Sequence, residues 1–232
     1  NNSYGLFTYS EDNSTGDGVG CVSNILIQNN EFKNNSSGIY IGMNQRTVSD
    51  FKVSNNKFVE NINAINIGGG GYGPYVGDNV ELSNNIFQSN SNSITADVYN
   101  LGYNGCSGSW HSNSELNIKK NYFLNDENAV NLNGIGYSKV YKNIFDNNNR
   151  GVYIGTSSDI RNNNTIEENQ FYNLEKSVVI YASGIYYQTQ NNVIKRNTFQ
   201  YFDGTQSNPI IDVNVRVNNN SVTENNFSYY KN

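Results

Sequence analysis

The sequence predicts an all-β protein, a parallel β-helix of about eight rungs with three short strands in each rung. Three observations predict this fold: the composition, a frame of residues that recurs along the chain, and the places where the recurrences differ in length. Asn supplies 48 of the 232 residues and Gly supplies 21, and both are poor helix formers. Aromatic residues make up 13% of the chain, which favours a packed core over disorder.

One frame recurs eight times along the chain. It reads apolar-x-x-Asn-x-Phe and continues, about six residues later, to a small residue followed by apolar-x-apolar. The alternation in its second part, as in Ile39-x-Ile41, has the period of two that is typical of a β-strand. Six copies are complete, the seventh is degraded and the eighth is cut short. They occupy 27–41, 53–67, 82–96, 118–132, 140–154, 166–180, 194–213 and 222–227.

The complete copies keep a fixed length of 15 residues, while the segments that join them vary. Successive Phe residues therefore stand 26, 29, 36, 22, 26, 28 and 28 residues apart. Fixed strands with one variable corner are typical of a solenoid, in which equivalent residues stack about 4.8 Å apart. We expect the repeated Phe to form an internal stack. We expect the Asn two positions before it to lie at a bend, in a left-handed backbone conformation, and to bond with the copies above and below.

On this frame, which covers nearly the whole chain, the sequence resembles the right-handed parallel β-helix repeat of the pectate-lyase-like superfamily. The resemblance implies the fold but leaves the activity open, because the superfamily includes polysaccharide lyases, glycoside hydrolases, epimerases, phage tailspikes and glycan-binding adhesins. It also implies that the Gly-Ile-x-Ile strand floors a substrate groove. The outward floor positions would be Tyr40, Asn66, Thr95, Asn131, Tyr153, Val179 and Asp212. The wall loops would be 42–52, 68–81, 97–117, 133–139, 155–165, 181–193 and 214–221.

Aromatic residues gather on this floor and in these loops. Sugars present apolar C–H faces that flat rings can hold, while amide and carboxyl groups bond to hydroxyls. The alternative is that the amphipathic Tyr rings pack their own loops against the coil. The candidate carbohydrate-binding residues are Tyr40, Tyr72, Tyr75, Tyr99, Tyr103, Trp110, Tyr153 and Tyr181.

Candidate catalytic residues are few. Glycoside hydrolysis needs two carboxyl groups roughly 5–10 Å apart, and the floor offers Asp212, with Asp97 in a distant rung. β-Elimination needs a base such as Lys or Arg and a positive charge that stabilises the enolate. Arg150 and Lys176 precede equivalent small residues in adjacent copies, so we expect them to lie side by side at the edge of the groove. Their alternative role is contact with a charged substrate.

The segment 11–18 resembles an oxygen-rich Ca²⁺ loop, although such residues also make ordinary turns and the closing Glu of an EF-hand is missing. Its candidate metal ligands are Asp12, Ser14 and Asp17. Ca²⁺ is the one cofactor that the sequence suggests, since the lone His111 is a poor metal site. The sequence leaves open whether Cys21 and Cys106 form a disulfide.

The chain begins in the middle of a frame, because 1–8 align with 34–41. We therefore expect one domain, 1–232, that is a fragment of a longer chain with rungs or a cap upstream. A net charge of −5 without a basic block argues against a nucleic-acid partner, and no apolar run approaches the roughly 20 residues of a membrane-spanning helix.

These observations favour a secreted or cell-surface monomer that holds a polysaccharide, such as cellulose or pectin, through its Tyr- and Trp-rich loops. Two alternatives stay open. The first is a polysaccharide lyase or glycoside hydrolase that acts in the groove. The second is a structural segment of a phage spike or an adhesin. A trimeric spike would be expected to show an outward apolar stripe, and we find none in the sequence.

Overall fold

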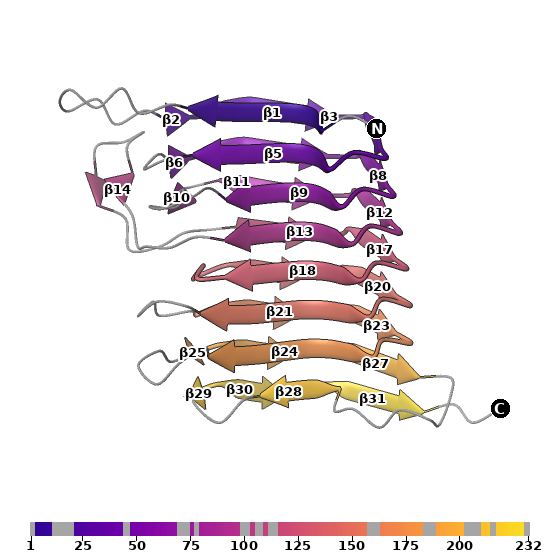
Figure 1. Cartoon of the computed structure of the whole chain (residues 1–232). Helices are drawn as coiled ribbons and strands as arrows, with labels where there is room; N and C mark the ends of the chain where they lie inside the picture. The colour runs from indigo at the N-terminus through magenta and orange to yellow at the C-terminus, as the bar shows by residue number, and fades with distance from the viewer. Residues whose placement is uncertain are drawn as a thin grey trace.

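The computed structural model describes residues 3–10, 21–43, 47–68, 75–76, 79–97, 103–104, 109–110, 116–156, 163–182, 189–201, 210–213 and 217–229. These residues form a right-handed parallel β-helix, in which three sheets of eight parallel strands wind around one core (Figure 1). The described residues contain no helix. The predicted fold class, with three strands in each of about eight rungs, is confirmed.

Each large sheet takes one strand from every rung. The sheet that carries the predicted floor positions is called the floor sheet here. Its strands are β1 (Tyr4–Ser10), β5 (Ser37–Met43), β9 (Asn63–Gly68), β13 (Asn92–Asp97), β18 (Asn128–Asn133), β21 (Arg150–Thr156), β24 (Lys176–Ala182) and β28 (Ile211–Val213). The second sheet contains β3 (Ile25–Gln28), β7 (Phe51–Ser54), β11 (Val80–Ser83), β16 (Leu116–Lys119), β19 (Lys139–Tyr141), β22 (Thr165–Glu167), β26 (Val193–Lys195) and β30 (Ser221–Thr223). The third sheet contains β4 (Glu31–Lys33), β8 (Lys57–Val59), β12 (Ile86–Gln88), β17 (Tyr122–Leu124), β20 (Ile144–Asp146), β23 (Gln170–Tyr172), β27 (Thr198–Tyr201) and β31 (Asn226–Tyr229).

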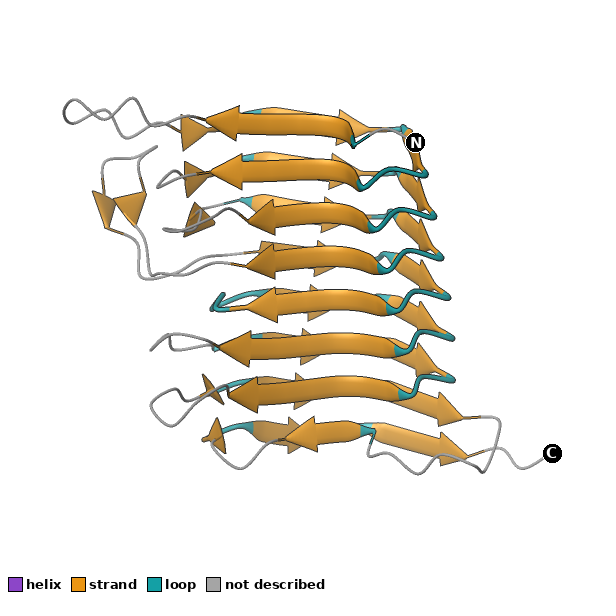
Figure 2. Cartoon of the chain, viewed as in Figure 1, coloured by secondary structure: helices purple, strands orange, loops and turns teal. Residues whose placement is uncertain are grey.

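Shorter strands stand at the corner between the floor sheet and the second sheet, where the joining segments vary in length (Figure 2). One small parallel sheet contains β2 (Cys21–Val22), β6 (Thr47–Val48) and β10 (Tyr75–Val76). A parallel pair contains β25 (Thr189–Gln190) and β29 (Val217–Asn218), and an antiparallel pair contains β14 (Tyr103–Asn104) and β15 (Ser109–Trp110). Most of the insertions thus collect at this corner, and the exception is the long connection from β27 to β28, which joins the third sheet to the floor sheet.

The repeated Phe residues form one column of rings in the core, as predicted. Neighbouring ring centroids lie 4.6–5.0 Å apart, and the ring planes differ by only 4–9°. The rings between Phe58 and Phe199 are fully buried, whereas Phe227 in the last rung is 47% exposed. The spacing of the column is close to the separation of adjacent strands in a sheet, about 4.8 Å, so strand pairing and ring stacking support the same register.

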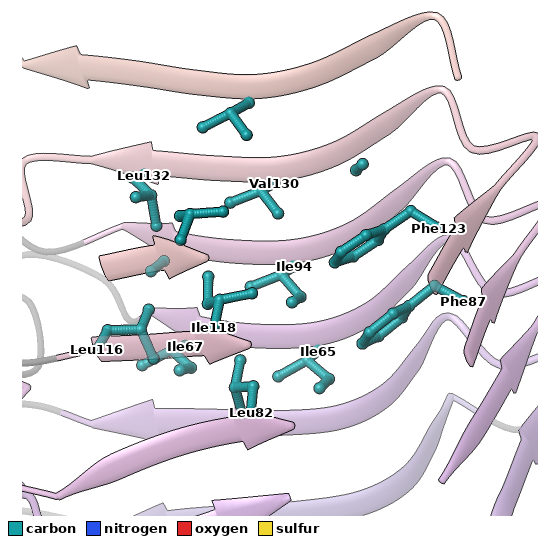
Figure 3. Close-up of a cluster of buried hydrophobic side chains, with 14 of the residues drawn as sticks. Ile65, Ile67, Leu82, Phe87, Ile94, Leu116, Ile118, Phe123, Val130 and Leu132 are labelled. Atoms are coloured by element: carbon teal, nitrogen blue, oxygen red, sulfur yellow. The ribbon is translucent and has the colours of Figure 1, made fainter. Parts of the chain in front are cut away.

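Branched apolar side chains fill the rest of the interior. Ile65, Ile94 and Val130 of the floor sheet point towards the second sheet, which contributes Leu82 and Ile118 (Figure 3). All five side chains are buried. Removing such a side chain from water contributes about 1.5–3 kcal/mol, and the corner strands β6 and β10 add the buried Val48 and Val76 to the same core.

The Asn that precedes each Phe by two positions takes part in a hydrogen-bonded ladder, as predicted. Asn85 is representative. It donates its backbone N–H and its Nδ2 to Oδ1 of Asn121 in the next rung, at 2.9 and 3.1 Å. Its Nδ2 also donates to the carbonyl oxygen of Val53, at 2.9 Å. Because each buried amide finds partners in the rungs before and after it, the polar column costs little desolvation energy.

The prediction that this Asn adopts a left-handed conformation is wrong. The left-handed residue is the one before it, for example Asn84 (φ 53°) before Asn85 and Lys120 (φ 55°) before Asn121. The backbone reverses at that residue, and the ladder Asn can then point its side chain inward to its partners. The sequence does not indicate this left-handed position, because Lys, Glu or Arg occupies it in five of the eight copies. The left-handed backbone costs each of these residues about 1–2 kcal/mol.

Two further ladders stand at the other corners, which accounts for more of the Asn content. Each of their members also follows a residue with positive φ. The ladder between the third sheet and the floor sheet, called the entry ladder here, contains Asn35, Asn61, Asn90, Asp126 and Asn148. The ladder at the start of the second sheet contains Ser138, Asn164, Asn192 and Asn220.

Candidate functional site

The outer face of the floor sheet carries one row of equivalent residues, called the floor row here. Strand register places these residues side by side as Phe7, Tyr40, Asn66, Thr95, Asn131, Tyr153, Val179 and Asp212. They alternate with buried residues such as Ile39 and Ile41, and all but Val179 keep exposed surface. The predicted floor positions are therefore confirmed as neighbours. With about 4.8 Å per strand, the row is roughly 34 Å long.

Three aromatic residues form a cluster at the N-terminal end of the floor row. The ring of Phe7 stacks on that of Tyr40, with centroids 5.4 Å apart and planes 5° apart. Tyr4 lies 4.8 Å from Phe7 and 5.5 Å from Tyr40. Tyr4 and Phe7 are 46% and 48% exposed. Of these three residues, only Tyr40 was predicted from the sequence as a carbohydrate-binding residue. The alignment of 1–8 with 34–41 already placed Phe7 at the position of Tyr40.

Tyr153 forms a second aromatic site four strands beyond Tyr40. Its ring lies over Gly155, where an added Cβ would come within 2.5 Å of it. The Arg150 guanidinium stands 5.3 Å from the centre of the ring, within the range of a cation–π contact. Burial raises the pKa of the Tyr153 hydroxyl, while the charge of Arg150 opposes that shift. Tyr181, opposite Gly155 on the next strand, is 39% exposed. This end of the row therefore combines an aromatic ring with a fixed positive charge.

The predicted neighbours Arg150 and Lys176 do lie side by side, since they pair across β21 and β24. Lys176 also stands 3.9 Å from Asp212, the last residue of the floor row, at a separation where an ion pair is weak. Tyr153, Lys176 and Asp212 thus occupy three adjacent strands. The arrangement places two positive charges and one carboxylate beside the second aromatic site.

Two buried polar atoms near Tyr153 have no hydrogen-bond partner. They are Nε of Arg150 and Oδ1 of Asn131, whose strand pairs with that of Tyr153. Both atoms are shielded from solvent, so each leaves a hydrogen bond unmade inside the protein, which is costly.

Asp97 lies apart from the other two catalytic candidates. It ends β13, two strands from Arg150 and five residues further along the strand direction, which is about 17 Å along the strand. Burial raises the pKa of the Asp97 carboxyl, and a 3.0 Å hydrogen bond from Asn133 opposes that rise. Asp97 and Asp212 stand four strands apart, about 19 Å. On the described part of the floor sheet, these two carboxylates are too far apart to act as the pair that a glycosidase needs.

Several candidates cannot be placed as side chains. Outside the described residues lie Tyr72, Tyr99, Asp12, Ser14, Asp17, His111 and Cys106. For Tyr75, Tyr103, Trp110 and Cys21 only the backbone is described, within β10, β14, β15 and β2. In the antiparallel hairpin of β14 and β15, Tyr103 pairs directly with Trp110. Within the described ranges, no three His, Cys, Asp or Glu residues gather as metal ligands would.

The structure corrects one expectation drawn from the sequence. A short outward apolar run does exist, on the third sheet, where Ile86, Tyr122 and Ile144 occupy three adjacent strands. Ile86 and Ile144 are both exposed. The sequence feature that indicates this run is the residue directly before each repeated Phe, because the side chain at that position points outward. In neighbouring rungs this position holds polar residues such as Lys57 and Gln170, so the run is limited to three strands.

Comparisons with protein-family models, with curated proteins and with solved structures found no match for this chain. The right-handed parallel β-helix is therefore established by the arrangement of the strands alone, and the pectate-lyase-like superfamily stays a resemblance. None of the described residues belongs to a helix long and apolar enough to cross a membrane.

Proposed function

We propose that the outer face of the floor sheet binds an extended polysaccharide, with a plant cell-wall glycan as the expected class, in an extracellular setting. The observation that carries the proposal is the floor row itself. Exposed aromatic rings stand at its N-terminal end, Tyr153 stands near its other end, and small polar side chains lie between them. Aromatic faces suit the C–H surfaces of sugars, and amides and hydroxyls suit their hydroxyl groups.

The separation of the two aromatic sites argues for a long ligand. Tyr40 and Tyr153 are four strands apart, which is about 19 Å. Asn66, Thr95 and Asn131 occupy the strands between them. A single sugar could contact one aromatic site only. An extended chain along the axis of the coil could contact both, and its affinity would gain from each.

The test is retention on a panel of insoluble or gelled polysaccharides. Tyr40→Ala and Tyr153→Ala should each reduce retention several-fold without unfolding the protein. The matched control is Tyr172→Ala, because Tyr172 is a half-buried outward tyrosine on the third sheet. If both floor variants bind as well as the unchanged protein, or if the control loses as much, the floor sheet is not the binding face.

Trp110→Ala and Tyr103→Ala test the contribution of the β14–β15 hairpin in the same assay. The backbone pairing of these two residues makes them one unit, so we expect similar losses from either change. A normal result for both would restrict binding to the floor row.

A polysaccharide lyase is the second candidate, favoured by the pairing of Arg150 with Lys176. In that reaction the uncharged amine of Lys176 would take the proton from the carbon beside the carboxyl group of a uronic acid, and the permanent charge of Arg150 would stabilise the enolate. The glycosidic oxygen would then leave as the carbon–carbon double bond forms. The panel should therefore also be scored for unsaturated products that absorb in the near ultraviolet. Products that disappear in Lys176→Ala would favour the lyase, and retention without products would favour binding alone.

A further inference from the structure

One member of the entry ladder is a carboxyl group instead of an amide. In this ladder the Nδ2 of three Asn residues donates to the carbonyl oxygen of a Phe in the preceding rung. The distances are 2.9 Å from Asn61 to Phe32, 3.2 Å from Asn90 to Phe58, and 3.1 Å from Asn148 to Phe123. Asn61 and Asn90 also donate Nδ2 to Oδ1 of the next member, at 3.1 Å each. The amide nitrogen position is thus surrounded by oxygen acceptors.

Asp126 fills the same place with its two oxygens. Its Oδ1 accepts from the backbone N–H and the Nδ2 of Asn90, at 2.8 and 3.1 Å, and its own N–H donates to Oδ1 of Asn148 at 2.8 Å. These bonds match those of an Asn. Oδ2 then occupies the position of the missing Nδ2, and it is buried without a hydrogen-bond partner.

The neighbours of Oδ2 are unsuited to a negative charge. By equivalence with the other ladder members, they are the carbonyl oxygen of Phe87 and Oδ1 of Asn148, both acceptors. The hydroxyl of Ser93, which accepts from Asn90, corresponds to the methyl group of Ala129 three residues after Asp126. The Ser93 hydroxyl lies near enough to the carboxyl to oppose the rise of its pKa, but Oδ2 itself has no hydrogen-bond partner, and a buried charge without a full set of partners is expensive.

We propose that Asp126 is a proton-dependent link in the entry ladder. With a proton on Oδ2, the carboxylic acid donates to one of the two facing oxygens and completes the ladder as an Asn would. Without the proton, the carboxylate repels those oxygens and weakens the corner that leads into β18 of the floor sheet. The coil is therefore more stable in mildly acidic than in mildly alkaline solution.

The electrostatics of the site agree with this geometry. Burial raises the pKa of the Asp126 carboxyl to about 7, while hydrogen bonds from the Asn90 backbone, Ser93 and the Asn90 side chain oppose the rise. On the same rung and the next one, the titratable or charged groups around this corner are Tyr122, Glu127, Asp146 and Arg150, and none of them is among the causes of the shift. The adjacent segment 88–94 of the preceding rung contains no titratable residue.

The sign of the effect follows from the two protonation equilibria. The ordinary carboxyl pKa of 3.8 holds in the unfolded chain, and the value in the folded protein lies near 7. Between these values the folded protein binds more protons, so its stability falls as the pH rises and levels off above the folded pKa. The folded-to-unfolded ratio should decrease on the order of a hundredfold or more across this window.

The test is denaturant unfolding of the full chain at pH 5 and pH 8 with Asp126→Asn. The amide supplies the missing donor, so the variant should lose the decrease in stability that the unchanged protein shows between these pH values. Asp50→Asn is the matched control, since the exposed Asp50 carboxylate accepts a hydrogen bond from the exposed Asn79 side chain; it should follow the unchanged protein. Parallel pH dependence of Asp126→Asn and the unchanged protein would overturn the proposal.

A second measurement decides the matter if Asp126→Asn fails to fold. An NMR titration of the carboxyl carbons in the unchanged protein should show that the signal assigned to Asp126 stays protonated at pH 5. If the Asp126 carboxyl is ionised at that pH in the folded protein, the proposal is wrong.

Discussion

Phe87 stacks on Phe123 with ring centroids 4.8 Å apart and planes 6° apart, although 36 residues separate them, the longest interval in the chain. Phe123 and Phe145 stack at the same distance across the shortest interval, 22 residues. The stack is unaffected by the length of chain between its members because the extra residues leave from the corner between the floor sheet and the second sheet. The Phe column and the variable loops are thus separate parts of each rung.

The Phe column should dominate the stability of the coil. Phe123 is fully buried between two stacked rings, so Phe123→Ala should lower the free energy of unfolding by about 3–5 kcal/mol. Phe227→Ala, in the half-exposed last ring, should cost much less. Urea unfolding of both variants measures the difference, and equal losses would show that ring burial is not what stabilises the column.

The Asn ladder should also be sensitive to truncation. Asn121→Ala removes the acceptor of the Asn85 N–H and the donor to the Leu82 carbonyl oxygen. Buried groups without partners cost about 1–3 kcal/mol each, so we expect a loss of at least about 2 kcal/mol in the free energy of unfolding. Asn117→Ala, on the outward face of β16 in the same rung, should change it by about 0.5 kcal/mol or less. A mild effect of Asn121→Ala would contradict the structural role of the ladder.

The orientation of Tyr153 should depend on Gly155. Gly155→Ala places a Cβ 2.5 Å from the ring, which must then move. We expect several-fold weaker polysaccharide retention with little change in melting temperature, because a flexible side chain gives way at low cost. Gly68→Ala is the control, because Gly68 occupies the equivalent position on β9 and its added Cβ would lie 3.3 Å from the nearest atom, Oδ1 of Asn66. Unchanged retention by Gly155→Ala would remove the Tyr153 ring from the binding surface.

Glu167 should make a pH-dependent contribution opposite in sign to that of Asp126. Burial pushes the pKa of Glu167 up, but hydrogen bonds and charges from Lys139 and Lys195 outweigh it and hold the pKa below its ordinary 4.5. Arg196 adds a bond at 2.8 Å. A lowered folded pKa stabilises the protein above pH 4.5, and this contribution is lost as the pH falls through the folded value.

The change Glu167→Gln should therefore cost about 1–3 kcal/mol at neutral pH and little in strong acid. Urea unfolding at pH 7 and at about pH 3 measures both effects. A loss of equal size at the two pH values would mean that the charge of Glu167 does not matter.

Much of the fold could be predicted because all copies of the frame must agree on one alignment of equivalent residues. Any wrong register would separate residues such as Tyr40 and Asn66, which the frame makes equivalent and the strands place side by side. Arg150 and Lys176 were predicted as neighbours for the same reason. The left-handed position was missed because Lys120 and Glu168, which have no intrinsic preference for it, occupy it under the constraint of the ladder next to them.

The sequence alone determined which residues are stacked, since a frame of constant length admits one register for strands, Phe column and Asn ladder. Only the tertiary structure decided what the stacked residues do to one another. It placed the ring of Tyr153 over Gly155, left Nε of Arg150 without a partner and put Oδ2 of Asp126 against acceptors. These outcomes depend on side-chain directions across several rungs, and a linear frame contains no information about them.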